Sequence, residues 1–361
     1  MQLITDRILK PLEIHDITWD TCPKGIEKGG YGMKLSLHDM VKLGLLYMNH
    51  GVHIDSQTGH VHRLLSPQYI DQAVSIQCVT DNEGFDYGYH CWVMPDGYLF
   101  NGMLGQNVYV FPEQKLIIAT QAGSQCFLPV KEMMEDIRTF IYDRKPEPGK
   151  DIFSNRRAEQ SYAMGQSSYM CQLHKIWGKT FTLEEGLPSV MPLFMQLFYQ
   201  QIVPNIDKIR LYAKYPSSSF IAPNGMRVRR FFVEFISDIE SIVLEAAIGH
   251  SIEQHILIHG QRYPVSVTCH MIPSETPLFE MRLRIDFLEE ANSRIYDFVW
   301  EDERLHAKAS ELPTLDYLTN SLLKGDILTI NTPKMPRYIP SNIQNKLNKM
   351  LKPDTYGFEK Q

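Results

Sequence analysis

The chain has 361 residues, more than a single hydrophobic core normally serves, so we expect two domains. Apolar residues make up 43% and charged residues 22% of it, a composition that excludes a disordered or fibrous protein. The net charge of -6 is mixed in sign and forms no basic stripe, so we expect no nucleic acid partner.

Cysteine usage and hydropathy exclude several further classes. The cysteines lie far apart with no CxxC pair, which indicates reduced thiols and no zinc ribbon. No apolar run approaches the roughly 18 residues of a membrane helix, and the charged, amphipathic start "MQLITDRILK" is not a secretory signal. We therefore expect no membrane segment, metal or cofactor in this chain, and a cytoplasmic location only by default. The six cysteines are Cys22, Cys78, Cys91, Cys126, Cys171 and Cys269.

Two capped helices are predicted in the first 75 residues. In "LSLHDMVKLGLLYMNHG", Ser36 is a helix cap, Asp39 closes a capping box and Gly51 ends the helix. In "LLSPQYIDQAV", Ser66 is the cap and Pro67 takes the first helical position.

From residue 87 the pattern changes to period two, which predicts an antiparallel meander. Its strands are expected over 87–94, 98–102, 106–111 and 115–120, followed by a helix over 130–144 that packs on the sheet. Gly102 and Gly105 stand at the head of one hairpin. They indicate either close approach of a ligand to the backbone or a bulge in a crowded strand.

The second half of the chain reads as a separate β-rich region. Residues 146–170 contain prolines and many polar residues, which is typical of a linker. At least six strands are expected within 171–300, and "LFEMRLRIDFLE" alternates apolar and charged residues most cleanly. An antiparallel sheet or a barrel-like domain follows from this pattern. Residues 301–361 give only mixed signals.

Five segments, taken in order, resemble the serine β-lactamase and penicillin-binding-protein superfamily, closest to the β-lactamase-related serine hydrolases and esterases. They are "LKPLEIHDITWDTCPKG", "GGYGMKLSLHDMVKLGLLYMNHGV", "RLLSPQYIDQAV", "YGYHCWVM" and "FNGMLGQNVYVFPEQKLIIA". The resemblance implies an α+β fold, with a β-lactamase/transpeptidase-like remnant (an antiparallel sheet with flanking helices) in residues 1–145. The region after about Cys171 resembles, more weakly, an extra β-rich domain of some bacterial members.

The resemblance also implies the chemistry of an acyl-enzyme. Members use a Ser-x-x-Lys pair, a Tyr-x-Asn, and a strand with a basic residue, a hydroxyl residue and glycine. In the family the first two elements precede the "PLEI" segment, where this chain begins, so we expect them to be missing. The pair Ser321 and Lys324 is the only Ser-x-x-Lys, and it lies far from the family position. Tyr47-Met48-Asn49 is the only Tyr-x-Asn, and its tyrosine belongs to the apolar face of a predicted helix.

The third element is present in altered form as Phe100-Asn101-Gly102, which makes the N–H of Met103 the candidate oxyanion donor. The substrate-binding residues expected from the resemblance are therefore Asn101, Gly102 and Met103. Phenylalanine replaces the cation that would hold a penicillin carboxylate, so an ester or amide without that carboxylate is the expected substrate.

The leading hypothesis is that the chain is the C-terminal part of a serine hydrolase, inactive alone. Its partners would be a small ester or amide and an N-terminal hydrolase half, or a second copy of itself. The alternative is a non-catalytic binding or interaction protein that uses the β-rich domain. Whether this chain is an enzyme stays open. A histidine group, His53, His60 and His62, has the spacing of metal ligands on a strand, but solvated loop histidines are the preferred interpretation.

Overall fold

The computed structural model divides the chain into two compact units, Met1–Arg138 and Thr139–Gln361. The predicted linker and the Ser321–Lys324 pair lie outside the residues that the structure describes. The described residues are 2–22, 24–55, 58–81, 84–123, 130–143, 173–199, 201–213, 219–221, 227–272, 279–301, 304–314 and 354–359.

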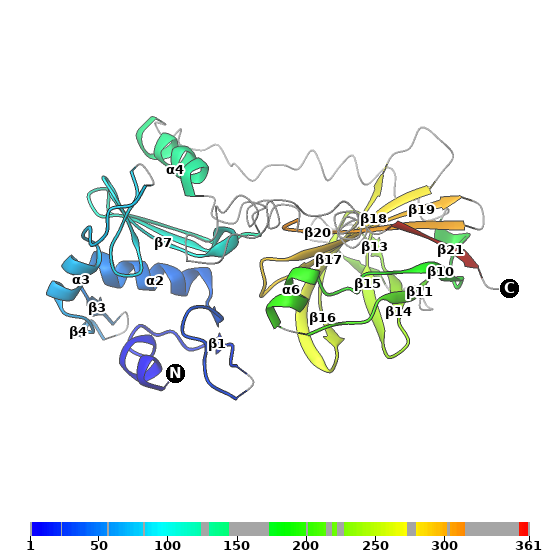
Figure 1. Ribbon diagram of the computed structural model, residues 1–361, viewed down its shortest axis with the longest axis horizontal. Helices are drawn as coiled ribbons and strands as arrows, with labels where there is room; N and C mark the ends of the chain where they lie inside the picture. The colour runs from blue at the N-terminus through cyan, green and yellow to red at the C-terminus, as the bar shows by residue number, and fades with distance from the viewer. Residues whose placement is uncertain are drawn as a thin grey trace, which may run out of the picture. The chain divides into compact units, whose positions relative to one another are not determined.

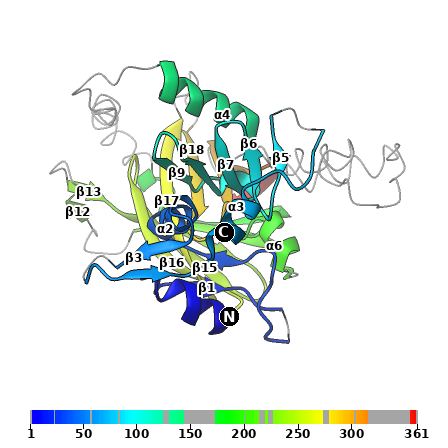
Figure 2. The same cartoon turned by 90° about the vertical axis from the view of Figure 1, so that its left-hand side faces the viewer.

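The first unit is built on a five-stranded antiparallel sheet with the order β5-β6-β7-β8-β9, which confirms the predicted meander. Helix α2 covers one face and helix α4 the other (Figure 1, Figure 2). The strands are β5 (Asp86–Tyr87), β6 (Trp92–Met94), β7 (Gly97–Asn101), β8 (Asn107–Phe111) and β9 (Leu116–Thr120). The other elements are α1 (Gln2–Ile4), η1 (Thr5–Leu9), β1 (Thr18–Trp19), β2 (Met33–Lys34), α2 (Leu37–Met48), β3 (Val52–Ile54), β4 (Val61–Arg63), α3 (Pro67–Ala73), η2 (Met103–Gly105) and α4 (Val130–Arg138).

Helix α2 has the predicted start and an unusually close contact with the sheet. The Ser36 hydroxyl accepts a hydrogen bond from the Asp39 N–H at 3.1 Å, as the capping box requires. At Gly44 an added Cβ would lie 2.9 Å from Val108 Cγ1 and 3.1 Å from Ile117 Cγ2. The missing side chain therefore lets the helix axis approach β8 and β9 closely, and this contact fixes the face of the sheet that α2 covers.

Helix α4 is attached to the opposite face by a sulfur contact and an ion pair. The Tyr109 hydroxyl on β8 lies 2.9 Å from Met133 Sδ. At the end of the helix, Arg138 donates from Nε and from its terminal nitrogen to both carboxylate oxygens of Asp96, at 2.9 and 2.8 Å. Asp96 occupies the turn between β6 and β7, so the pair ties α4 to that hairpin.

We expect Asp96→Asn to lower the free energy of unfolding of the first unit by about 0.5–1 kcal/mol at pH 7. The Arg138 hydrogen bond holds the pKa of the Asp96 carboxyl below its ordinary value. Because this folded pKa is depressed, the stabilisation is present above about pH 4 and is lost as the pH falls through the folded pKa. Urea unfolding of both proteins at several pH values measures this, and a difference that persists or grows in acid would contradict it.

The second unit is a nearly closed barrel of ten antiparallel strands, ordered β15-β14-β11-β10-β21-β20-β19-β18-β17-β16 (Figure 1). Apart from the separate β12–β13 hairpin, strands that follow one another in sequence pair, except β15 with β16, and the first strand, β10, pairs with the last, β21. The strands are β10 (Thr180–Leu187), β11 (Ile206–Tyr212), β12 (Ser219–Ile221), β13 (Arg227–Arg229), β14 (Phe231–Ile236), β15 (Ser241–Ala246), β16 (Ser251–Ile258), β17 (Gln261–Ile272), β18 (Phe279–Phe287), β19 (Ser293–Glu301), β20 (Arg304–Leu312) and β21 (Asp354–Glu359), with η3 (Thr139–Asp143) and α6 (Leu193–Tyr199).

The barrel is open between β15 and β16, which share no backbone ladder. A side chain on β16 makes hydrogen bonds to the β15 backbone there instead. A tight turn joins the two strands through a bridge between Ala247 and His250. Further along, the Gln254 side-chain amide accepts from the Glu245 N–H at 2.9 Å and donates to the Glu245 carbonyl at 2.7 Å. One glutamine thus satisfies the backbone groups that an adjacent strand would otherwise pair.

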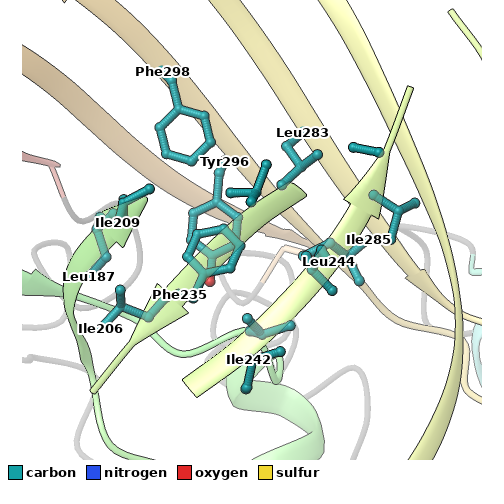
Figure 3. Close-up of a cluster of buried hydrophobic side chains, with 14 of the residues drawn as sticks. Leu187, Ile206, Ile209, Phe235, Ile242, Leu244, Leu283, Ile285, Tyr296 and Phe298 are labelled. Carbon is teal, nitrogen blue, oxygen red and sulfur yellow. The ribbon is translucent and has the colours of Figure 1, made fainter. Parts of the chain in front are cut away.

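Apolar side chains fill the interior of the barrel (Figure 3). On β18, Met281, Leu283 and Ile285 are fully buried, while the alternate residues face outward, so the predicted alternation is confirmed. Aromatic rings form the centre of this core: the Phe235 and Tyr296 ring centroids are 4.7 Å apart.

A buried ion pair holds the segment around α6 against the end of the barrel where β19 begins and β20 ends. Arg294 and Glu311 are direct cross-strand partners, 3% and 6% exposed, with nitrogen and oxygen 3.1 Å apart. Arg294 also donates to the Met191 carbonyl at 3.0 Å, and Glu311 accepts from the Leu193 N–H at 2.7 Å. Both charges therefore satisfy backbone groups where α6 begins.

The barrel extends beyond residue 300, into the segment 301–361 whose sequence signals are mixed. Strands β20 and β21 complete the sheet. Their inward positions include Ala307, Ala309 and Gly357, which are small, and the charged Glu311. A period-two search that relies on large apolar residues does not detect such strands.

Candidate functional site

The candidate site lies where β7 ends and its hairpin partner turns back. Asn101 is paired with Asn107, and the Gly102 N–H donates to the Gln106 carbonyl at 2.7 Å. In an antiparallel ladder, successive residues direct their backbone groups to alternate sides. Since Gly102 faces β8, the N–H and carbonyl of Asn101 face the other side. Gly102 is extended (φ -108°, ψ 163°), so the Met103 N–H also faces that side.

That side of β7 is open beyond residue 99. Strand β6 pairs only with Gly97, Tyr98 and Leu99, and among the described residues no other strand continues the ladder past Asn101. The hydrogen bonds of this turn found in the described part of the chain do not use the Met103 N–H. The structure therefore brings the Asn101 backbone and the Met103 N–H together on one unpaired strand edge.

The two glycines at this hairpin have structural explanations of their own. A Cβ on Gly102 would lie 2.7 Å from the Gln106 carbonyl oxygen and 2.9 Å from Gln106 Cβ. Gly105 has a φ of +96°, and the preceding Leu104 is already left-handed at +61°. The backbone that passes close to Gly102 is thus that of its own hairpin, and the glycines alone do not indicate a ligand.

The Asn101 side chain is engaged on the α4 face of the sheet. Its amide nitrogen donates to Asn107 Oδ1 at 2.6 Å, and Asn107 donates in turn to the Tyr109 hydroxyl at 3.1 Å. Asn107 is completely buried, so this network fixes the end of β7. Only the backbone of Asn101 faces the open edge, a distinction that the sequence pattern did not make. Asn107 itself was missed, because an asparagine inside an apolar strand carries no motif.

Phe100 lies on the opposite face of β7, under α2, where aromatic residues gather. Its ring centroid is 4.8 Å from that of Tyr47 in an edge-to-face arrangement. Burial and the hydrogen-bonded Tyr69 hydroxyl raise the pKa of the Tyr47 phenol far above its ordinary value. A phenol held neutral in this way is a poor proton acceptor, which favours the structural interpretation of Tyr47-Met48-Asn49.

The Cys91 thiol, which interacts electrostatically with Tyr47, is also held in its protonated form. Cys91 is 1% exposed, and its Sγ donates to the Ala73 carbonyl at 3.0 Å. Burial raises the pKa of Cys91 to about 11, which leaves very little thiolate at neutral pH. Cys91 is therefore a packing residue rather than a substitute nucleophile.

The histidines of the β3–β4 hairpin form no metal site. His53 and His62 are register partners, and the rings of His60 and His62 are 6.4 Å apart. Across the described ranges, no group of three or more histidine, cysteine or acidic side chains is arranged to hold a metal ion. Nor does any described helix have the length and apolarity needed to cross a membrane.

No protein-family model matches this chain, and a search of curated proteins finds no match.

Proposed function

We propose that the first unit is one wall of the acyl-binding site of a β-lactamase-related serine hydrolase, which acts on an uncharged ester or amide. In this role the Met103 N–H stabilises the oxyanion, and the Asn101 backbone pairs with the extended part of the substrate. The serine nucleophile and its lysine base come from residues outside this chain, which is inactive alone. The second unit is an accessory barrel.

The observation that carries the proposal is the unpaired edge of β7. A carbonyl oxygen placed at this edge meets a backbone donor that the hairpin already holds in position, which is the condition for electrostatic stabilisation of a tetrahedral intermediate. The Asn101–Asn107–Tyr109 network supports the same role because it makes the strand end rigid. Phe100 gives the α2 side of the site an uncharged wall.

The other half of the proposed enzyme has a place to bind. Among the described residues, β9 is the edge strand of this sheet, and all five of its residues are half-buried, whereas every residue of β8 is buried. An edge strand of this kind pairs readily with a strand from another polypeptide. An N-terminal hydrolase segment paired with β9 would extend the same sheet that contains β7.

We expect the chain alone to bind a simple ester, and Met103→Pro to weaken that binding about tenfold. Compared with Met103→Ala, proline removes only the N–H, because Met103 opens a 3₁₀ turn and follows an extended Gly102, a setting that accepts proline. Met103→Ala keeps the N–H and is the matched control. Saturation-transfer NMR with methyl 3-phenylpropanoate measures the affinity, and equal binding by the proline and alanine variants would contradict the oxyanion role.

The absence of a nucleophile is tested separately with an activated phosphonate. A fluorophosphonate probe is expected to leave the 361-residue chain unlabelled, since an acylable serine requires an adjacent base. Intact-mass spectrometry detects the adduct, and stoichiometric labelling at any side chain would show that the chain carries its own nucleophile.

A further inference from the structure

We propose that Met133 on α4 is a site of oxidation to the sulfoxide by a hydroperoxide, and that the added oxygen strengthens the attachment of this helix to the sheet. The polar groups around its sulfur distinguish this methionine, and they come from a strand that is distant in sequence. The site is independent of the proposed function.

Two buried side chains of β8 direct hydrogen-bond donors at the Met133 sulfur. The Tyr109 hydroxyl lies 2.9 Å from Sδ, and Asn107 Nδ2 lies 3.9 Å from it. Both donors keep their hydrogens at neutral pH, since an amide does not titrate and burial raises the pKa of Tyr109 to about 12. A thioether is only a weak acceptor for them. Among the methionines that the structure describes, no other sulfur receives a hydrogen bond from a side chain.

The distance between Asn107 and the sulfur matches the insertion of one oxygen atom. At 3.9 Å, Nδ2 and Sδ are too far apart for a strong hydrogen bond. An S–O bond of about 1.5 Å followed by an N–H···O hydrogen bond of about 2.9 Å, bent at the oxygen, spans about 3.9 Å. The Tyr109 hydroxyl at 2.9 Å is already in contact with the sulfur. Asn107 is therefore the donor that a sulfoxide oxygen can meet.

A hydroperoxide can reach Met133 from the solvent side of α4. Met133 is half-buried, whereas the next residue, Met134, is 1% exposed, and Asn107 and Tyr109 are completely buried. The sulfur gives an electron pair to one peroxide oxygen, and the S–O bond forms as the O–O bond breaks. The other oxygen leaves as water or an alcohol with the proton of the transferred oxygen. Sulfur is thereby oxidised by two electrons and the hydroperoxide reduced by two.

Oxidation thus replaces a weak acceptor with a strong one where α4 meets β8. Rotation about the Cγ–Sδ bond of the unbranched side chain turns the new oxygen toward Asn107 while the sulfur stays in place. The Asn101 amide donates to Asn107 Oδ1, on the other side of that amide group, so the new bond does not compete with it. The sulfoxide therefore joins α4 to the network that fixes the end of β7.

The modification itself is tested by brief treatment of the full chain with hydrogen peroxide. Fragment mass spectrometry should find Met133 oxidised at least tenfold faster than Met134, its matched control on the same helix, because only Met133 is accessible. Equal rates at the two residues would overturn the assignment of Met133.

The strengthened attachment is tested by hydrogen exchange of the α4 amides. In a Met134→Leu background a peptide over Val130–Arg138 contains one methionine, so its oxidised and unoxidised forms separate by mass within one sample. We expect the oxidised form to exchange about fivefold more slowly, because one more hydrogen bond breaks when the helix opens. Equal or faster exchange in the oxidised form would show that the oxygen does not strengthen the contact.

Two variants of β8 identify the donor. Asn107→Leu should abolish the slowing, whereas Tyr109→Phe should keep it, since the Asn107 amide remains. Comparing both forms of each variant cancels any loss of stability that they share. If Asn107→Leu does not fold, Met133→Gln, whose amide oxygen takes the place of the sulfoxide oxygen, should exchange about fivefold more slowly than Met133→Leu. Slowing that survives Asn107→Leu, or equal exchange of the glutamine and leucine variants, would contradict the role of Asn107.

Discussion

Replacing Glu311 with alanine is expected to lower the free energy of unfolding of the barrel by about 3–5 kcal/mol. Removal of one partner leaves the Arg294 guanidinium, only 3% exposed, without its counter-ion. It also removes the acceptor of the Leu193 N–H, so the start of α6 loses a hydrogen bond. Both losses fall on the same end of the barrel.

The paired variant Arg294→Met with Glu311→Leu should recover much of this loss. Two apolar side chains of similar volume need no counter-ion, and such replacements of buried ion pairs are often neutral. Recovery should be incomplete, because the Met191 carbonyl and the Leu193 N–H lose the partners that the ion pair provides. The difference between the double variant and the sum of the two single variants gives the coupling energy.

The measurement must separate the two units, whose transitions need not coincide. In a background with Trp19→Phe and Trp92→Phe, fluorescence comes from Trp177 and Trp300, which both belong to the core of the second unit. Urea unfolding of each variant in this background reports the barrel. A loss below about 1 kcal/mol for Glu311→Ala, far under the cost of an unpaired buried charge, would contradict the structural role assigned to the pair.

The parts of the fold that follow from the sequence are those with strong local signals. Ser36 and Ser66 cap α2 and α3 as predicted, because a side-chain cap is set by residues three apart. The predicted meander appears as β5 to β9. Closure of the barrel could not be predicted in the same way, since it depends on β21 entering between β10 and β20 and on a glutamine across the β15–β16 gap.

The same distinction between local signals and tertiary structure applies to the candidate site. The altered motif singles out Met103 as a candidate, and the strand register directs its N–H to an unpaired strand edge. The Asn101 side chain lies on the α4 face of the sheet and the Phe100 side chain on the α2 face. For a sheet with helices on both faces, the sequence alone does not show which helix covers which side chain. The family assignment itself stays a prediction.

Gly51→Ala is expected to destabilise the first unit by about 2–5 kcal/mol. Gly51 has a φ of +81°, which costs a residue with a side chain about 1–2 kcal/mol. An added Cβ would also lie 2.2 Å from the Leu65 carbonyl oxygen, a backbone atom, and relieving such an overlap costs about 1–3 kcal/mol. The Gly51 carbonyl accepts from the Leu64 N–H at 2.9 Å, so the chain cannot move aside without breaking this bond.

Gly59→Ala separates the two contributions. Gly59 has a similar φ of +70°, but a Cβ there would meet no atom within 4 Å. This variant should therefore lose only the conformational part, about 1–2 kcal/mol. Urea unfolding followed by Trp19 and Trp92 fluorescence, with Trp177 and Trp300 replaced by phenylalanine, reports the first unit. Equal losses at the two glycines would mean that Leu65 moves freely, and the close packing between the end of α2 and the start of α3 would then not be a constraint on the fold.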